Sequence, residues 1–124
     1  MIPQNIKDLI RALITKTTSK KAIWEKTSRS NKFKLLFEKG VIKIDNWSDN
    51  DNLENVNFGI YNAFGDRIYN FCASEKDKEF NLLMELYDAT RRAVNKVDET
   101  IIGLFDEVNS EKSIGNMKSK IQIF

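Results

Sequence analysis

The stretch FKLLFEKGVIKI, residues 33–44, decides the fold of this chain. On both sides of Lys39-Gly40, apolar side chains recur at every second position, which is the pattern of a half-buried β-strand. Glycine readily takes the positive φ of a primed turn, so Lys39-Gly40 predicts a tight hairpin. Two antiparallel strands therefore form the centre of the predicted structure, the second running from Val41 to Trp47.

The two-residue period continues outward from this hairpin, over residues 21–73. A short strand around Trp24 precedes the polar turn 27–31, and two further strands, 56–61 and 67–72, follow the polar loop 48–55 and the turn 64–66. Short polar connections between successive strands favour an antiparallel meander. We therefore predict one five-stranded sheet.

Helical spacing replaces the two-residue period at both ends of the sheet region. Apolar residues between Ile2 and Ile14 recur in steps of three and four, and Pro3 suits a first helical turn. After the sheet, Ser74 with Asp77 resembles a capping box, and the same steps continue over 80–108. This segment forms either one long helix or two helices with a short kink. Asn95, followed by Asp98 and Glu99, favours the break.

The predicted fold is a single α+β domain over residues 1–109. It comprises an N-terminal helix, a five-stranded antiparallel meander, and a C-terminal helix, either continuous or kinked near Asn95 into two, packed on one sheet face. Residues 110–124 form a tail that can dock as an edge strand. The predicted core consists of Ile6, Leu9, Leu13, Phe33, Leu35, Phe37, Ile42, Ile44, Phe58, Ile60, Ile68, Leu83, Leu86, Tyr87 and Val94.

Composition excludes several classes of protein. The chain has 124 residues, of which 41% are hydrophobic and 31% charged, with one Cys and no His. These values are typical of one soluble domain, and a single Cys cannot form an internal disulfide. Because no window resembles a signal peptide or a membrane span, we expect a cytoplasmic protein.

Candidate catalytic and metal-binding motifs are weak. The loop 45–54 is rich in Asp and Asn, but counting from Asp49 it places Leu53 and Glu54 where a calcium-binding EF-hand requires an oxygen ligand and a glycine. Cys72 has no His to activate it and is expected to be a buried structural residue. The glycines are isolated, so no phosphate-binding loop is present. We therefore expect a non-enzymatic protein without a metal or another cofactor.

Charge is distributed unevenly along the chain. Residues 1–44 carry eleven Lys and Arg against three acidic residues, whereas residues 45–110 carry six against fourteen. One interpretation is a dipolar surface without a ligand; the other is a nucleic-acid site that uses the basic residues beside Trp24 and Phe33. The candidate contacts for nucleic acid are Lys20, Lys21, Lys26, Arg29, Lys32 and Lys34.

The main functional hypothesis is a protein-interaction or regulatory module. The distal part of the helical seam and the apolar end of the tail offer surface for a homodimer or for another protein partner. The candidate interface residues are Val97, Ile101, Leu104, Val108, Ile121, Ile123 and Phe124.

Three motifs together resemble a recurrent type of small, stand-alone bacterial α+β protein. They are WEKT at 24–27, IYNAFGDRI at 60–68 and LYDATRRAVNKVDETI at 86–101. The resemblance carries no activity and no catalytic residue. It implies a bacterial, cytoplasmic accessory or regulatory role, and it supports the break near Asn95.

Overall fold

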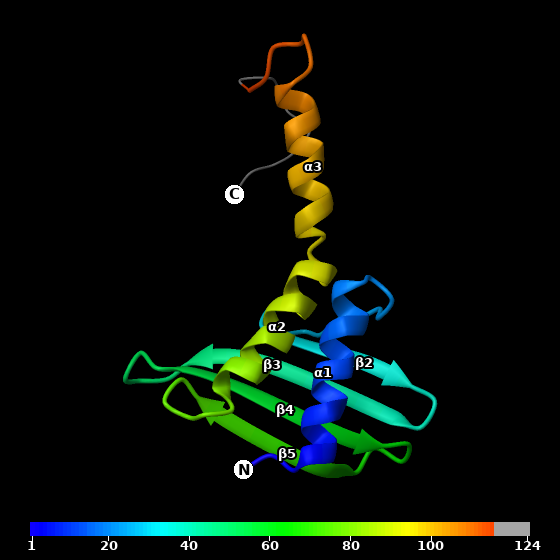
Figure 1. Cartoon of the computed structure of the whole chain (residues 1–124), viewed down its shortest axis with the longest axis vertical. Coiled ribbons are helices and arrows are strands. Elements are labelled where there is room, and N and C mark those ends of the chain that lie inside the picture. Colours follow the sequence, from blue (N-terminus) through cyan, green and yellow to red (C-terminus); the bar gives the residue numbers. More distant parts are fainter. Residues whose placement is uncertain (116–124) are drawn as a thin grey trace.

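The computed structural model describes residues 1–115 and shows an α+β fold (Figure 1). The elements, in chain order, are α1 (Gln4–Thr18), β1 (Glu25–Lys26), β2 (Lys32–Phe37), β3 (Gly40–Ser48), β4 (Glu54–Asn62), β5 (Arg67–Ser74), α2 (Phe80–Val94) and α3 (Val97–Val108).

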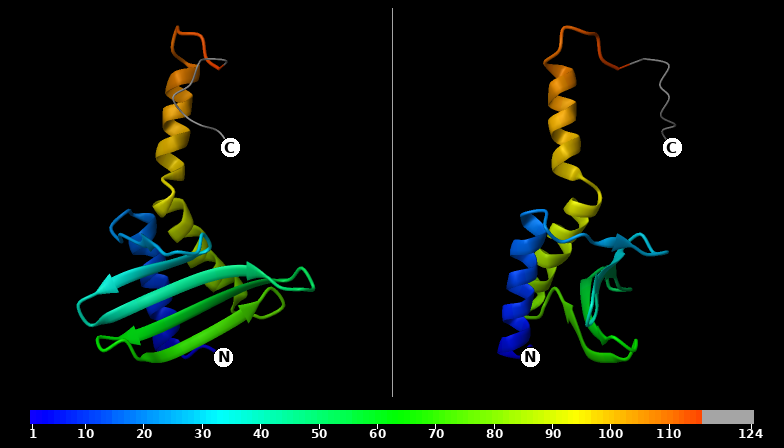
Figure 2. Two further views of the ribbon diagram at one scale, coloured as in Figure 1. Left: turned by 180° about the vertical axis from the view of Figure 1, so that it is seen from behind. Right: turned by 90° about the vertical axis from the view of Figure 1, so that its right-hand side faces the viewer.

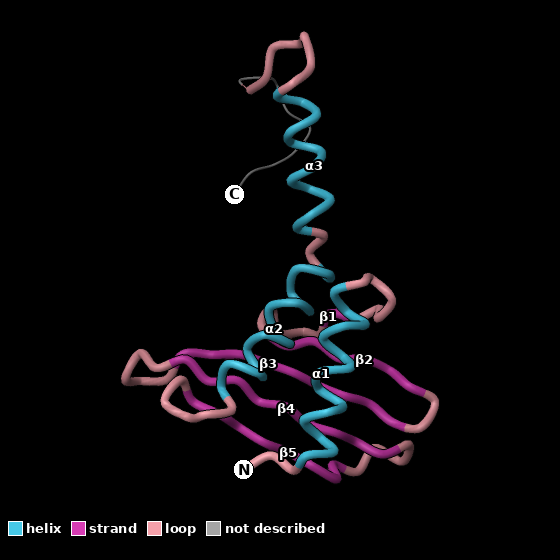
Figure 3. The backbone as a smooth tube through the Cα atoms, in the orientation of Figure 1, coloured by secondary structure: helices cyan, strands magenta, loops and turns pink. Residues whose placement is uncertain are grey.

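The five strands form one sheet in the order in which they occur in the chain, each antiparallel to the next (Figure 3). The predicted meander is thus confirmed. Its register places Phe33 opposite Ile44, Ile44 opposite Phe58 and Phe58 opposite Phe71. Because side chains alternate across a strand, this row of apolar residues lies on one face of the sheet.

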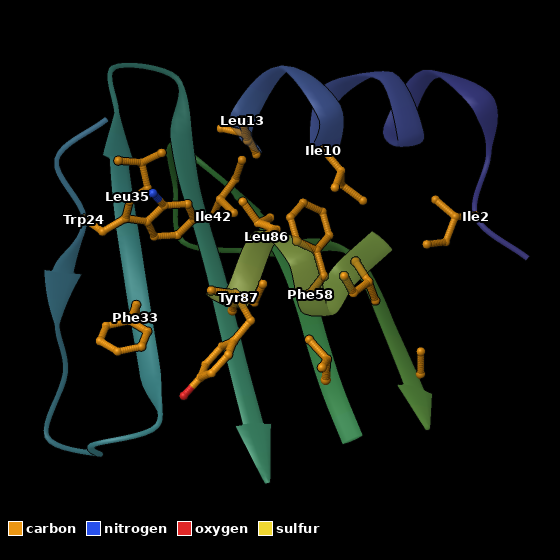
Figure 4. Close-up of a cluster of buried hydrophobic side chains, with 14 residues drawn as sticks. Ile2, Ile10, Leu13, Trp24, Phe33, Leu35, Ile42, Phe58, Leu86 and Tyr87 are labelled. Carbon is orange, nitrogen blue, oxygen red and sulfur yellow. The ribbon is translucent and has the colours of Figure 1, made fainter. Parts of the chain in front are cut away.

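Helices α1 and α2 cover that face, and no other element within residues 1–115 covers the opposite face (Figure 2). The core lies between the helices and the sheet (Figure 4), where the rings of Phe33 and Tyr87 have centroids 5.8 Å apart. Its buried hydrophobic residues are Ile2, Ile10, Leu13, Trp24, Phe33, Leu35, Ile42, Ile44, Val56, Phe58, Ala73, Leu83, Leu86 and Tyr87.

Three residues predicted for the core are exposed: Leu9 by 36%, Phe37 by 47% and Ile68 by 63%. Phe37 is the last residue of β2, at the hairpin. Ile68 lies at the register shift between β4 and β5, where the alternation of side chains is interrupted. Ile6, Ile60 and Val94 are half-buried at the edge of the core.

The hairpin between β2 and β3 differs from its prediction in detail. The two turn residues are Glu38 and Lys39, because Phe37 already pairs with Gly40. Gly40 does not have a positive φ. A Cβ atom there would overlap the backbone oxygen of Tyr61 on β4, so glycine is needed for the close approach of two strands.

The capping-box prediction is wrong for the start of α2: one of the two reciprocal hydrogen bonds forms, but in a turn that precedes the helix. The Ser74 amide donates to the Asp77 carboxylate at 2.8 Å, and the Lys76 amide donates to Ser74 Oγ at 3.3 Å. These bonds close a turn, and α2 begins only at Phe80.

The helical segment breaks where the sequence indicates. Helix α2 ends at Val94 and α3 begins at Val97, with Asp98 and Glu99 in its first turn. Lys96, rather than Asn95, takes the left-handed conformation, with φ 52° and ψ 46°. Of these two helices, α2 packs on the sheet, whereas α3 projects away from it (Figure 1).

The predicted tail is only partly described. Residues 110–115 follow α3 and form no strand. The proposed edge strand, with Ile121, Ile123 and Phe124, lies outside the described residues.

Candidate interaction surface

Helix α3 extends the chain beyond the compact body formed by the sheet, α1 and α2 (Figures 1 and 2). None of its twelve residues is buried. Five large apolar side chains are between 43% and 62% exposed: Ile101, Ile102, Leu104, Phe105 and Val108. A soluble domain rarely leaves so many neighbouring apolar groups in contact with water, so this surface is the strongest candidate site.

The apolar residues of α3 share one side of the helix. At about 100° per residue, the arc that contains Val97 and the five exposed apolar residues spans roughly 160°. Asp98, in the first turn, lies within this arc and pairs with Arg92. Glu99, Asp106 and Glu107 lie outside the arc, and α3 contains no Lys or Arg. The helix therefore presents a wide apolar face flanked by negative charge.

Two ion pairs connect the first turn of α3 to the body. Lys20 Nζ lies 2.7 Å from Glu99 Oε1, and an Arg92 guanidinium nitrogen lies 2.6 Å from Asp98 Oδ1. The hydrogen bond between Lys20 and Glu99 is the main cause that raises the pKa of Lys20 and lowers the pKa of Glu99. These contacts orient α3 at its base only.

A groove of about 510 Å³ lies beside this base. Ile14, Ala22, Trp24 and Val94 supply apolar walls, and four cationic and four anionic side chains also line it. The balanced charge gives no preference for an anionic or a cationic ligand. The groove is the junction between α3 and the body.

The structure places the predicted interface residues as follows. Ile101, Leu104 and Val108 lie together on the exposed face, while Val97 is half-buried beside the break. The sequence prediction missed Ile102 and Phe105 because it followed a single seam of one residue per turn. Ile102 directly follows Ile101, and Phe105 directly follows Leu104. Because neighbouring residues of a helix are about 100° apart, such apolar pairs indicate a wider apolar face.

The predicted nucleic-acid residues do not form one patch. Lys20 and Lys26 line the groove beside α3, whereas Lys32 and Lys34 occupy alternate positions of β2 that face away from the helices. On that uncovered face, Lys34 pairs with Lys43, whose ammonium lies 4.5 Å from the centre of the Tyr61 ring. Lys21 and Arg29 are exposed in the connections around β1.

The two aromatic residues of the nucleic-acid hypothesis belong to the core. Trp24 is 6% exposed and Phe33 is 2% exposed. The indole of Trp24 donates a hydrogen bond to Thr17 Oγ1 at 3.0 Å. Neither ring is therefore accessible for stacking on a base.

The prediction that Cys72 is buried is wrong. Cys72 is exposed, because it pairs with Asn57 on the uncovered face of the sheet, while its neighbours Phe71 and Ala73 point to the helices. Partial burial of the thiol is the largest cause that raises its pKa, and a protonated thiol is a poor nucleophile.

The acidic loop is organised by its own hydrogen bonds. Asp49 Oδ1 accepts from the amides of Asp51 and Leu53, and Asp49 Oδ2 accepts from Asn55 Nδ2 at 3.1 Å. These bonds lower the pKa of Asp49, the one from Asn55 most. Within residues 1–115, no group of three or more Cys, Asp or Glu side chains is arranged to hold a metal ion.

Comparisons with protein-family models, with curated proteins and with solved structures gave no match to this chain. Among the described helices, none combines the length and the apolar character needed to cross a membrane.

Proposed function

We propose that this protein is a non-enzymatic interaction or regulatory module of the cytoplasm, which associates with further copies of itself through α3. One observation supports the proposal above all: five large apolar side chains of α3 remain 43–62% exposed on a helix that projects from the body.

The length of α3 supports the same conclusion. A helix shorter than about 12–15 residues is marginally stable in water unless it packs on other structure. Helix α3 has twelve residues, includes Gly103 in its interior and is attached only at its base. Packing of its apolar face on a partner would supply the missing stabilisation.

The test replaces Ile101 and Leu104 with Asp. Burying one large apolar side chain contributes about 1.5–3 kcal/mol, so we expect the double variant to associate at least about a hundredfold more weakly. Light scattering coupled to size-exclusion chromatography measures the mass, and circular dichroism checks that the sheet remains folded.

Phe64→Asp is the control, because Phe64 is 91% exposed and lies outside both α3 and the groove beside its base. It should associate like the wild type. A wild-type protein that stays monomeric at high micromolar concentration would refute the proposal.

Nucleic-acid binding is the second candidate function. It is favoured by one observation, the presence of Lys32, Lys34 and Lys43 on the uncovered face of the sheet. Nucleic-acid binding is the weaker candidate, because Trp24 and Phe33 are buried and cannot stack on a base.

A further inference from the structure

A second groove lies between α1 and one end of the sheet, and it is separate from the groove beside α3. It has a volume of about 240 Å³, below the range of roughly 300–1,000 Å³ that small-molecule pockets occupy. Leu9 of α1 and Phe37, Ile60 and Ile68 of the sheet line it. Such a shallow apolar groove is suited to the side chains of another protein segment.

The lining explains why three core predictions failed. Leu9, Phe37 and Ile68 have the spacing of interior residues, and all three border this groove. Phe37 continues the row of β2 residues, Phe33 and Leu35, that face the helices. At this end of the sheet, the helix-facing side is therefore left exposed among the described residues.

An amphipathic helix is the element that covers the rest of this face, as α1 and α2 show. Within residues 1–115, α3 is the one helix whose apolar face is uncovered. The charges are complementary, because Lys39 is the one charged residue that lines the groove, while the last turn of α3 carries Asp106 and Glu107, which form no ion pair among the described residues.

Helix α3 does not reach the groove of its own molecule. Glu99 in its first turn binds Lys20, just beyond the C-terminal end of α1, and from there α3 runs away from the sheet (Figure 1). Leu9 lies nine residues before Thr18, the last residue of α1, or about 14 Å back along that helix. A contact between α3 and this groove must therefore join two molecules.

We propose that α3 of one copy packs its apolar face into the groove formed by Leu9, Phe37, Ile60 and Ile68 of a second copy, with Lys39 close to the acidic last turn of α3. This inference rests on the proposed self-association and specifies its acceptor. Direct pairing of two α3 helices would offer no cation to Asp106 and Glu107, which form no ion pair among the described residues. The helix-to-groove contact joins two different surfaces of the protein. A closed dimer forms when each copy places its α3 in the groove of the other.

A complementation experiment tests the acceptor. The helix variant combines Ile101→Asp with Leu104→Asp, and the groove variant combines Phe37→Glu with Ile68→Glu. We expect each variant alone to be monomeric at concentrations where the wild type associates. Their equimolar mixture should form a one-to-one heterodimer, because it restores one intact helix and one intact groove.

Phe64→Glu is the control for the groove variant, because Phe64 is 91% exposed and does not line the groove. It should associate like the wild type, and circular dichroism of each variant checks its fold. If the groove variant associates like the wild type, or the mixture stays monomeric, the inference is overturned while self-association through α3 stands. If the wild type is monomeric, the proposed function itself fails.

Charge reversal tests the role of Lys39. Lys39→Glu should weaken association by about tenfold at low salt, and adding Asp106→Lys with Glu107→Lys to the same chain should recover most of that loss.

A third variant tests whether the segment 116–124, rather than α3, occupies the groove. If replacing Ile121, Ile123 and Phe124 with Ser abolishes association as the groove variant does, that segment rather than α3 occupies the groove and the inference is wrong.

Discussion

At the scale of single residues, two buried threonines differ in their hydrogen bonding. Thr17 Oγ1 accepts a bond from the indole of Trp24, whereas the fully buried Thr90 Oγ1 has no hydrogen-bond partner among the described residues. A buried hydroxyl without a partner has lost its bonds to water without replacement, which lowers stability.

We therefore expect Thr90→Val to raise the free energy of unfolding by about 1 kcal/mol, because it replaces an unsatisfied hydroxyl with a methyl group of similar size. Urea denaturation measures the change. Thr17→Val is the matched control and should destabilise the protein by about 1–3 kcal/mol, since it leaves the Trp24 N–H without its acceptor. A loss of stability in Thr90→Val would show that its hydroxyl is bonded in solution.

At the scale of elements, the attachment of α3 determines which surface it presents. The break at Lys96 uses a left-handed residue that is not glycine, a conformation with a cost of about 1–3 kcal/mol. The ion pairs Lys20–Glu99 and Arg92–Asp98 bridge this break. Both pairs are exposed to solvent, so each contributes little to stability and acts mainly on orientation.

The pKa of Glu99 reports whether the Lys20–Glu99 ion pair forms, because the hydrogen bond from Lys20 is the main cause that lowers it. We expect its carboxyl to titrate below its ordinary pKa of 4.5, and we expect Lys20→Met to return the pKa towards that value. Because the pKa of Glu99 is lowered and that of Lys20 is raised, the contact is complete between pH 4.5 and pH 10.5. It is lost as the pH falls through the pKa of Glu99 or rises through that of Lys20.

A carbon-detected NMR titration of the Glu99 carboxyl measures this shift. Lys21→Met is the control, because it removes a neighbouring ammonium that forms no ion pair among the described residues. A Glu99 pKa that stays the same in Lys20→Met would mean that the pair does not form in solution.

At the scale of the whole molecule, the uneven charge of the sequence does not become a single basic patch. The N-terminal third supplies α1, β1, β2 and part of β3, and its lysines point to both sides of the sheet. The second candidate function therefore depends on the uncovered face, where Lys32 and Lys34 project.

The second candidate function predicts micromolar binding of single-stranded oligonucleotides at low salt, with affinity that falls steeply as salt rises. Lys32→Glu with Lys34→Glu should then weaken binding to all sequences and reduce the salt slope by about two. Fluorescence anisotropy measures both quantities. Lys16→Glu with Lys78→Glu changes the net charge equally and is the control, because both residues are exposed and neither is a candidate contact. Equal losses in the two variants would exclude a defined site on the sheet.

Local pattern predicted the elements and their order. The two-residue period of residues 33–44 and its neighbours predicted the meander, and the residues around Asn95 predicted the break between α2 and α3. These features depend on residues that are near one another in the chain. For the same reason, the sequence could predict Ile101, Leu104 and Val108 as part of an apolar seam.

Only the tertiary structure decided which apolar residues are covered. Leu9, Phe37 and Ile68 have interior spacing but border an open groove, and Cys72 lies on the uncovered face although its neighbours are core-facing. Coverage depends on where α1 and α2 lie across the sheet and on where α3 leaves it. That arrangement is set by packing between segments distant in the chain, which spacing along one segment does not determine.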